Sequence, residues 1–266
     1  MTRPTQSESG SGDAETSGVS TTFLRWEIVL VLWVSLGAAA IRALLNLAER
    51  LTSGRPLNEQ VAPIISPVAP DRPWLDISYQ IAFIVLPLGA VALAGYLLHR
   101  SSESFSTIGF DFRRPGSDLL RGAFLAALVG GTGLAFYLIA YQLGLSAQIA
   151  AAEVVGNWWD WVLLLLRAAE NAVLEEVIIL GFLLHRLDQV GVRAGPAIFI
   201  SALIRGAYHL YQGFGGFIGN FVMGLLFGWL FRRWGRVGPM VVAHFLIDAV
   251  AFIGYATLAD RIAWLP

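Results

Sequence analysis

A long apolar segment at residues 158–186 carries two adjacent carboxylates, Glu175 and Glu176, far from either of its ends. A helix of this length would measure about 43 Å, more than the roughly 30 Å of a bilayer core. A charged side chain in the middle of a membrane helix costs roughly 2.5–3.5 kcal/mol, and two neighbouring carboxylates also repel each other. The pair therefore predicts a functional polar site that other helices enclose.

The composition supports a membrane protein, because 56% of the 266 residues are hydrophobic and only 14% are charged. Soluble domains usually have about 25% charged residues. The net charge of -1 and the absence of a basic stripe argue against a nucleic-acid partner. The chain has no cysteine, which excludes disulfides, thiolate metal sites and cysteine nucleophiles. All 18 basic residues are arginine, which indicates a bacterial source with a GC-rich genome.

We expect an all-α, polytopic transmembrane bundle of about seven spans. The polar tail at residues 1–22 should be disordered. Residues 23–104 should form N-terminal transmembrane helices, which a proline-rich, extended linker at 51–74 divides, and residues 105–260 the rest of the bundle. The expected spans are residues 26–47, 77–98, 122–143, 158–186, 196–211, 214–231 and 239–258. Glycines in the third and sixth spans, at 130, 131 and 133 and at 216, 224 and 228, should allow close helix contacts.

Arginine is distributed unevenly between the connecting segments. Residues 99–121, 186–193 and 232–236 contain arginine and fall on one face, whereas 145–157 on the other face contains none. The positive-inside rule then places the N-terminus in the cytoplasm and the C-terminus outside. We expect a multi-pass protein of the inner (plasma) membrane, in contact with the lipid bilayer.

Two other predicted helices also carry ionisable residues, each pair at a spacing that shares one helix face. Arg205 precedes His209 by four residues, and His244 precedes Asp248 by four. If the hairpin between spans four and five projects about 10–12 Å into the cytoplasm, these histidines and the paired glutamates reach one level. That level is roughly 6–10 Å below the cytoplasmic surface, so we expect the site to open to the cytoplasm.

These motifs resemble those of the CPBP intramembrane metalloprotease family (CAAX proteases and bacteriocin-processing enzymes), also called the ABI family. The similarity rests on Glu175-Glu176 followed by an apolar run and Gly181, on His209, and on His244-x-x-x-Asp248. Residues 108–115 also resemble the usual lead-in of that family, and the similarity covers about residues 105–255. The resemblance implies a CPBP-like protease core within residues 105–260 and an intramembrane endopeptidase that acts on a membrane-proximal peptide or protein.

The resemblance also implies roles. Glu175 would be the general base that activates water, and Glu176 and His209 would support it or hold the nucleophile. His244 and Asp248 would stabilise the oxyanion or orient the water. Two positions depart from the family pattern, since Leu180 stands at the usual arginine and Arg205 at the usual phenylalanine.

We expect Arg205 to supply the positive charge that the first motif lacks, and therefore to lie within about 6 Å of a glutamate carboxylate.

The residues leave the metal requirement open. Peptide hydrolysis needs an activated water, an oxyanion stabiliser and a proton donor, which glutamates and histidines can supply without a cofactor. Alternatively, Glu175, His209 and His244 form the ligand set of a catalytic divalent metal such as Zn²⁺.

Two other functions stay open. A non-catalytic scaffold or immunity-type membrane protein would use the same residues only for helix packing. A proton-coupled transporter would predict inverted repeats and discontinuous helices. The substrate and the oligomeric state do not follow from the sequence.

Overall fold

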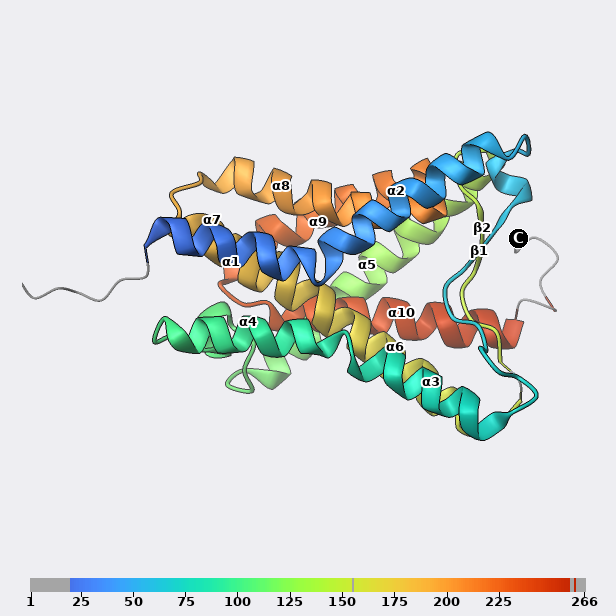
Figure 1. Cartoon of the computed structure of the whole chain (residues 1–266), viewed down its shortest axis with the longest axis horizontal. Helices are drawn as coiled ribbons and strands as arrows, with labels where there is room; N and C mark the ends of the chain where they lie inside the picture. The colour runs from blue at the N-terminus through green and yellow to red at the C-terminus, as the bar shows by residue number, and fades with distance from the viewer. Residues whose placement is uncertain (1–19, 155, 259–260, 262–266) are drawn as a thin grey trace, which may run out of the picture.

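A computed structural model describes residues 20–154, 156–258 and 261 as an elongated bundle of helices (Figure 1). The expected disordered tail lies outside these residues up to position 19, and α1 already begins at Thr21. The α-helices of this part are α1 (Thr21–Trp33), α2 (Leu36–Thr52), α3 (Pro73–Val85), α4 (Leu88–Arg100), α5 (Pro115–Gln142), α6 (Asp160–Glu175), α7 (Leu183–Gln189), α8 (Ala194–Tyr208), α9 (Phe214–Trp234) and α10 (Gly238–Leu258). The all-α class is as predicted.

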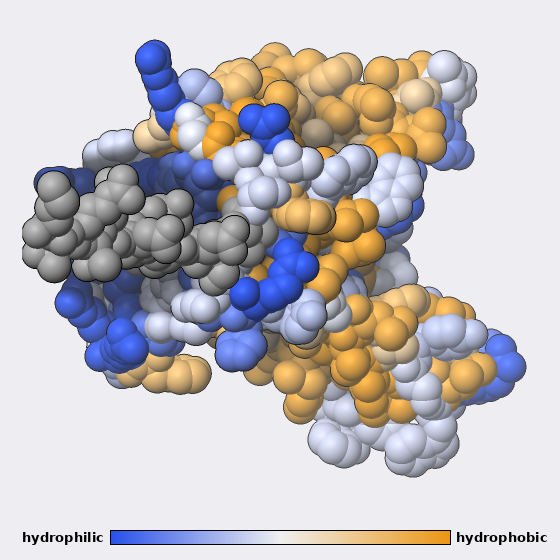
Figure 2. Space-filling model, turned by 60° about the vertical axis from the view of Figure 1, so that its left-hand side comes forward, coloured by the Kyte–Doolittle hydropathy of each residue, from blue (hydrophilic) through white to orange (hydrophobic). Residues whose placement is uncertain are grey.

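Helices form at all seven expected spans, but not all of them have the length and composition of a membrane span. Four do so: α3 with α4, α5, α9 and α10, and the pair α1–α2 makes a fifth if its 48° bend is counted as one span. Helix α8 has only 15 residues, and the segment around Glu175 is charged and interrupted. Apolar residues cover most of the flanks, while hydrophilic ones gather at the ends (Figure 2).

The two ends of the bundle differ in composition. At one end, left in Figure 1, lie the start of α5 and the turns α7–α8 and α9–α10, and we call it the arginine-rich end. Here Nη2 of Arg236 donates hydrogen bonds to Asp118 Oδ2 at 2.6 Å and to Asp111 Oδ1 at 3.0 Å. These bonds connect the α9–α10 turn to the start of α5. The hydrogen bond from Arg236 lowers the pKa of Asp111.

The opposite end, which we call the strand end, holds a feature that the sequence did not indicate. After the short helix η1 (Leu57–Glu59), strand β1 (Val61–Pro63) pairs in parallel with β2 (Gln148–Ala150). Within the proline-rich linker only residues 61–63 form a strand, and this strand is docked on β2, whereas residues 57–59 form a short helix. Pro63 is compatible with this pair because a two-stranded sheet has only edge strands, where the missing N–H is tolerated.

The core is centred on a π-helical stretch, η3 (Glu176–Phe182), between α6 and α7. All seven of its residues are buried, and the six that carry a side chain, Glu176 included, are at most 1% exposed. Apolar side chains from α4, α8, α9 and α10 pack around it. The expected small-residue contact is confirmed at Gly224, where an added Cβ would lie 2.8 Å from the backbone of Ala202.

Candidate active site

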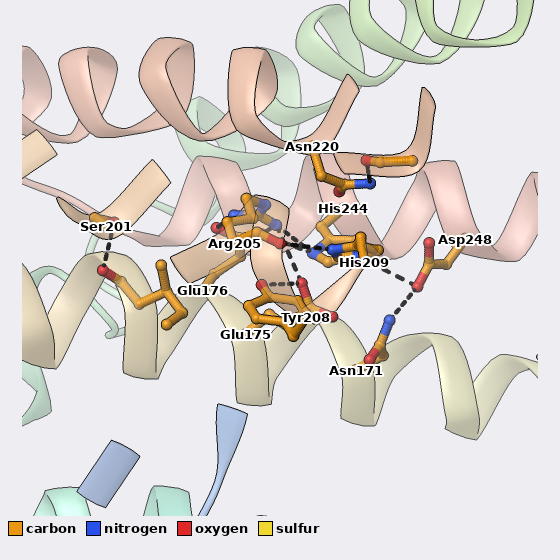
Figure 3. A network of polar contacts seen from close by, with 12 residues as sticks. Asn171, Glu175, Glu176, Ser201, Arg205, Tyr208, His209, Asn220, His244 and Asp248 are labelled. Carbon is orange, nitrogen blue, oxygen red and sulfur yellow. Dashed lines mark hydrogen bonds and ion pairs between the residues drawn. The ribbon is translucent and has the colours of Figure 1, made fainter. Parts of the chain in front are cut away.

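The two glutamates lie at the junction between two kinds of helix. Helix α6 ends at Glu175, and η3 begins at Glu176. Adjacent residues on a regular α-helix point about 100° apart, yet both carboxylates contact the same guanidinium, that of Arg205 (Figure 3). A π-helical turn is rare and is frequently found at functional sites. The π-helical stretch begins at the carboxylate pair, and there Glu175 is 4% exposed and Glu176 is 0% exposed.

Arg205 on α8 is fully buried and contacts three partners of the site. Its Nη1 donates to Glu176 Oε2 at 3.0 Å, and its Nη2 donates to Glu176 Oε1 and, at 3.4 Å, to Glu175 Oε2. The fork of an arginine matches a carboxylate in this two-point manner. The expected proximity of Arg205 to the glutamates is confirmed. Phe227 lies beneath the guanidinium, 5.5 Å from its Cζ to the ring centre.

His244 extends the network to α10. Its Nδ1 donates to Glu176 Oε1 at 2.7 Å and lies 3.2 Å from Arg205 Nη2, while its Nε2 lies 3.5 Å from Asp248 Oδ2. On the far side of Asp248, the Nδ2 of Asn171 on α6 donates to Oδ2 at 2.8 Å. The pair on α10 is thus connected back to the helix that carries Glu175 (Figure 3).

The end of α8 supplies the remaining polar groups. The hydroxyl of Tyr208 donates to Glu175 Oε2 at 2.6 Å, and Nδ1 of His209 donates to the carbonyl oxygen of Arg205 at 2.9 Å. Because a carbonyl oxygen only accepts, Nδ1 carries the proton, and in the neutral ring Nε2 is a free acceptor. All six predicted site residues therefore lie in one connected group. Tyr208 and Asn171 were missed, since neither residue type signals chemistry at an apolar helix position.

A cavity of about 230 Å³ reaches one side of this group. Its polar wall includes Glu175, Tyr208, His209 and Asn171, and its apolar wall includes Ile64 and Ile65 of the segment after β1. Glu176, Arg205 and His244 do not line it. The site is therefore divided into a face toward the cavity and an interior that supports it.

The cavity lies on the side of the cluster that faces the strand end, where Ile64 and Ile65 line it. We expected access from the cytoplasm, which the arginine distribution predicts at the arginine-rich end. Buried residues such as Ile179 and Met240, both 0% exposed, fill the space between the glutamates and the arginine-rich end. The core around η3 therefore closes that side.

Within the described residues, one acidic and imidazole group has metal-ligand spacing: Glu175, Glu176 and His244 place ligand atoms within 4.8 Å of one another. His209, which we expected among the ligands, is not in this group. Both oxygens of Glu176 and Oε2 of Glu175 already accept hydrogen bonds from Arg205, whose charge is permanent. A divalent ion among them would lie beside a buried guanidinium, so these residues do not fit a metal in this arrangement.

The fold and the site together define a multi-pass, all-α membrane protein with an enclosed cluster of carboxylates, imidazoles and one arginine. Residues 157–250 match the model of the family described as type II CAAX prenyl endopeptidase Rce1-like, and this confirms the expected resemblance to the CPBP/CAAX protease family. The match includes every residue of the cluster. No curated protein and no solved structure matches the chain.

Proposed function

We propose that this protein is an intramembrane endopeptidase that hydrolyses a peptide bond of a membrane-proximal substrate with a water activated by Glu175. The observation that carries the proposal is the position of Glu175. Of the two adjacent glutamates, it alone lines the cavity. Its Oε2 accepts the bonds from Tyr208 and Arg205, and within the described chain no hydrogen bond to its Oε1 is found.

In the proposed reaction, Glu175 Oε1 takes a proton from water as the water oxygen adds to the substrate carbonyl carbon. The two electrons of the C=O π bond move to the oxygen and give a tetrahedral oxyanion. Nε2 of His209 accepts a hydrogen bond from the second hydrogen of the water, which stays on the oxygen, and orients the water. When the C–N bond breaks, Glu175 returns the proton to the leaving nitrogen.

Glu176, Arg205 and His244, which do not line the cavity, have a supporting role in this proposal. Both oxygens of Glu176 are engaged by Arg205, and one also by His244. Glu176 is therefore occupied as an anchor and does not compete for the water. Arg205 contributes the positive charge that allows two carboxylates to share a dry interior.

The test compares wild type with Glu175→Gln in proteoliposomes. The probe is a library of quenched fluorescent peptides that carry an acyl chain to hold them at the bilayer. We expect wild type to cleave a subset and Glu175→Gln to lose about 10²- to 10⁴-fold in rate, the usual contribution of a general base. Glu49→Gln, an exposed position on α2, is the matched control and should keep full activity.

The same experiment separates an enzyme from a non-catalytic scaffold. A scaffold predicts that Glu175→Gln changes only thermal stability and that wild type cleaves no peptide of the library. Cleavage that survives in the purified Glu175→Gln variant would exclude Glu175 as the base.

A further inference from the structure

Asn171 lies on the cavity wall, one helical turn before Glu175 and on the same face of α6. Four residues of α-helix correspond to a rise of about 6 Å. The amide nitrogen of Asn171 carries two hydrogens, and one of them forms the hydrogen bond to Asp248, with 2.8 Å between Nδ2 and Oδ2. In the part of the chain that the structure describes, no other hydrogen bond of this side chain is found, which leaves one N–H beside the cavity.

Two other donors on the wall are committed elsewhere. The hydroxyl of Tyr208 donates to Glu175, and the ring N–H of His209 donates to the carbonyl oxygen of Arg205. The guanidinium of Arg167 is held by the carbonyl oxygen of Phe83 at 2.6 Å and by Glu170 at 3.1 Å, and it belongs to a residue two helical turns from Glu175, farther along α6 than Asn171. Tyr211 accepts a bond from Gln212 and has a hydroxyl hydrogen to give, but no carboxylate holds that hydroxyl in one orientation.

We propose that Asn171 is a catalytic residue whose free amide N–H stabilises the oxyanion of the tetrahedral intermediate. The inference rests on the proposed endopeptidase function. Preorganised donors that point to the developing charge supply a large share of catalysis in a dry site. An asparagine amide beside the base, with its orientation determined by a neighbour, meets that requirement.

Asp248 is then a positioning residue. A carboxylate oxygen can only accept, so its contact with Asn171 must be made by the amide nitrogen and not by the amide oxygen. This sets which way the side chain is turned and directs the second N–H away from α10. The Nε2 of His244, 3.5 Å from the same oxygen, helps to hold the carboxylate in place.

The experiment uses the full-length protein in proteoliposomes and the peptide that wild type cleaves fastest in the library. Asn171→Ala should lower kcat by about 10²- to 10³-fold, the usual effect of losing one oxyanion donor, and leave KM within about threefold. Tyr96→Phe, at a position of α4 that is 63% exposed, is the control and should retain wild-type kcat. Tyr211→Phe tests the other donor on the wall and should lower kcat by less than Asn171→Ala does. The exchange variant Asn171→Asp with Asp248→Asn keeps an amide–carboxylate pair between α6 and α10, so its melting temperature should stay near wild type.

The exchange variant separates catalysis from packing. It places an acceptor where the oxyanion donor was, so we expect a folded protein with kcat as low as that of Asn171→Ala. A purely structural Asn171 would instead regain kcat together with stability, and this outcome would overturn the inference. So would an Asn171→Ala variant with kcat within about threefold of wild type, or a loss confined to Tyr211→Phe. If the wild-type protein cleaves no peptide, both this inference and the proposed function are wrong. The three outcomes above, in which the wild-type protein is active, contradict only the inference.

Discussion

At the level of single residues, Arg205 provides the positive charge that balances the buried glutamates of the site. Two glutamates that are 4% and 0% exposed stay in the interior beside one guanidinium that is also fully buried. Breaking a buried ion pair by removing one partner is strongly destabilising, because the remaining charge has neither water nor a counter-ion. Arg205 stands where the family pattern has an aromatic residue, so this chain carries its positive charge on α8 instead of on η3.

Arg205→Leu should therefore lower the free energy of unfolding by about 3–5 kcal/mol. Adding Glu176→Gln to it should recover part of the loss, because the second change removes one of the two unpaired carboxylates. Both values can be measured by denaturant titration in detergent micelles. Arg193→Leu, at an exposed arginine just before the same helix, should change stability by no more than about 0.5 kcal/mol. Equal losses in Arg205→Leu and in the double variant would show that Arg205 and Glu176 are not coupled.

Helix contacts explain which glycines matter at the level of elements. The sequence suggested close packing at two glycine clusters, and only one of them is confirmed. Gly224 on α9 approaches the backbone of α8. Gly131 and Gly133 on α5 have nothing within 4 Å of an added Cβ. A glycine spacing shows that a close approach is possible, but the partner helix decides whether it occurs.

Gly224→Ala should destabilise the protein by about 1–3 kcal/mol, because the new methyl group would push α8 away from α9. The neighbouring Arg205 would move with α8, so activity should fall as well. Gly131→Ala provides the control and should be neutral or stabilising by up to about 1 kcal/mol, since alanine favours a helix. Thermal melting of the two purified variants gives the comparison, and similar melting temperatures would contradict the proposed contact.

The π-helical stretch is an element that no sequence pattern indicated. The apolar run after Glu176 predicted a continuous helix through residue 186, and the helical character is correct. The wider turn depends on how η3 packs against four other helices. Such packing is tertiary information, because an apolar run is equally compatible with an α-helix and with a π turn.

At the level of the whole molecule, the cavity lies on the side of the cluster that faces away from the arginine-rich end. The arginine-rich loops predict a cytoplasmic arginine-rich end. The cavity reaches the site from the strand end, where the segment after β1 forms part of its wall. With the predicted orientation, a substrate would approach from the non-cytoplasmic half of the membrane, and this is the orientation that we propose.

Labelling of single cysteines tests that orientation, because the natural chain contains no thiol. Phe112→Cys, at a position 96% exposed at the arginine-rich end, should react with a membrane-impermeant maleimide only after the cells are permeabilised. Asp71→Cys, at an exposed position of the strand end, should react in intact cells. The opposite pattern would reverse the membrane orientation and place the cavity on the cytoplasmic side.

The sequence by itself determined the fold class, the helical segments and the six residues of the cluster. The length of an apolar segment and the free-energy cost of a charge within it depend on the local sequence. Ionisable residues in apolar helices can therefore be recognised from the sequence alone. Only the tertiary structure decided which glutamate faces the cavity, how Arg205 engages both carboxylates, that Tyr208 and Asn171 belong to the cluster, and on which side of the cluster the cavity lies. These features depend on contacts between residues distant in the chain, whose geometry is set by packing and not by residue type.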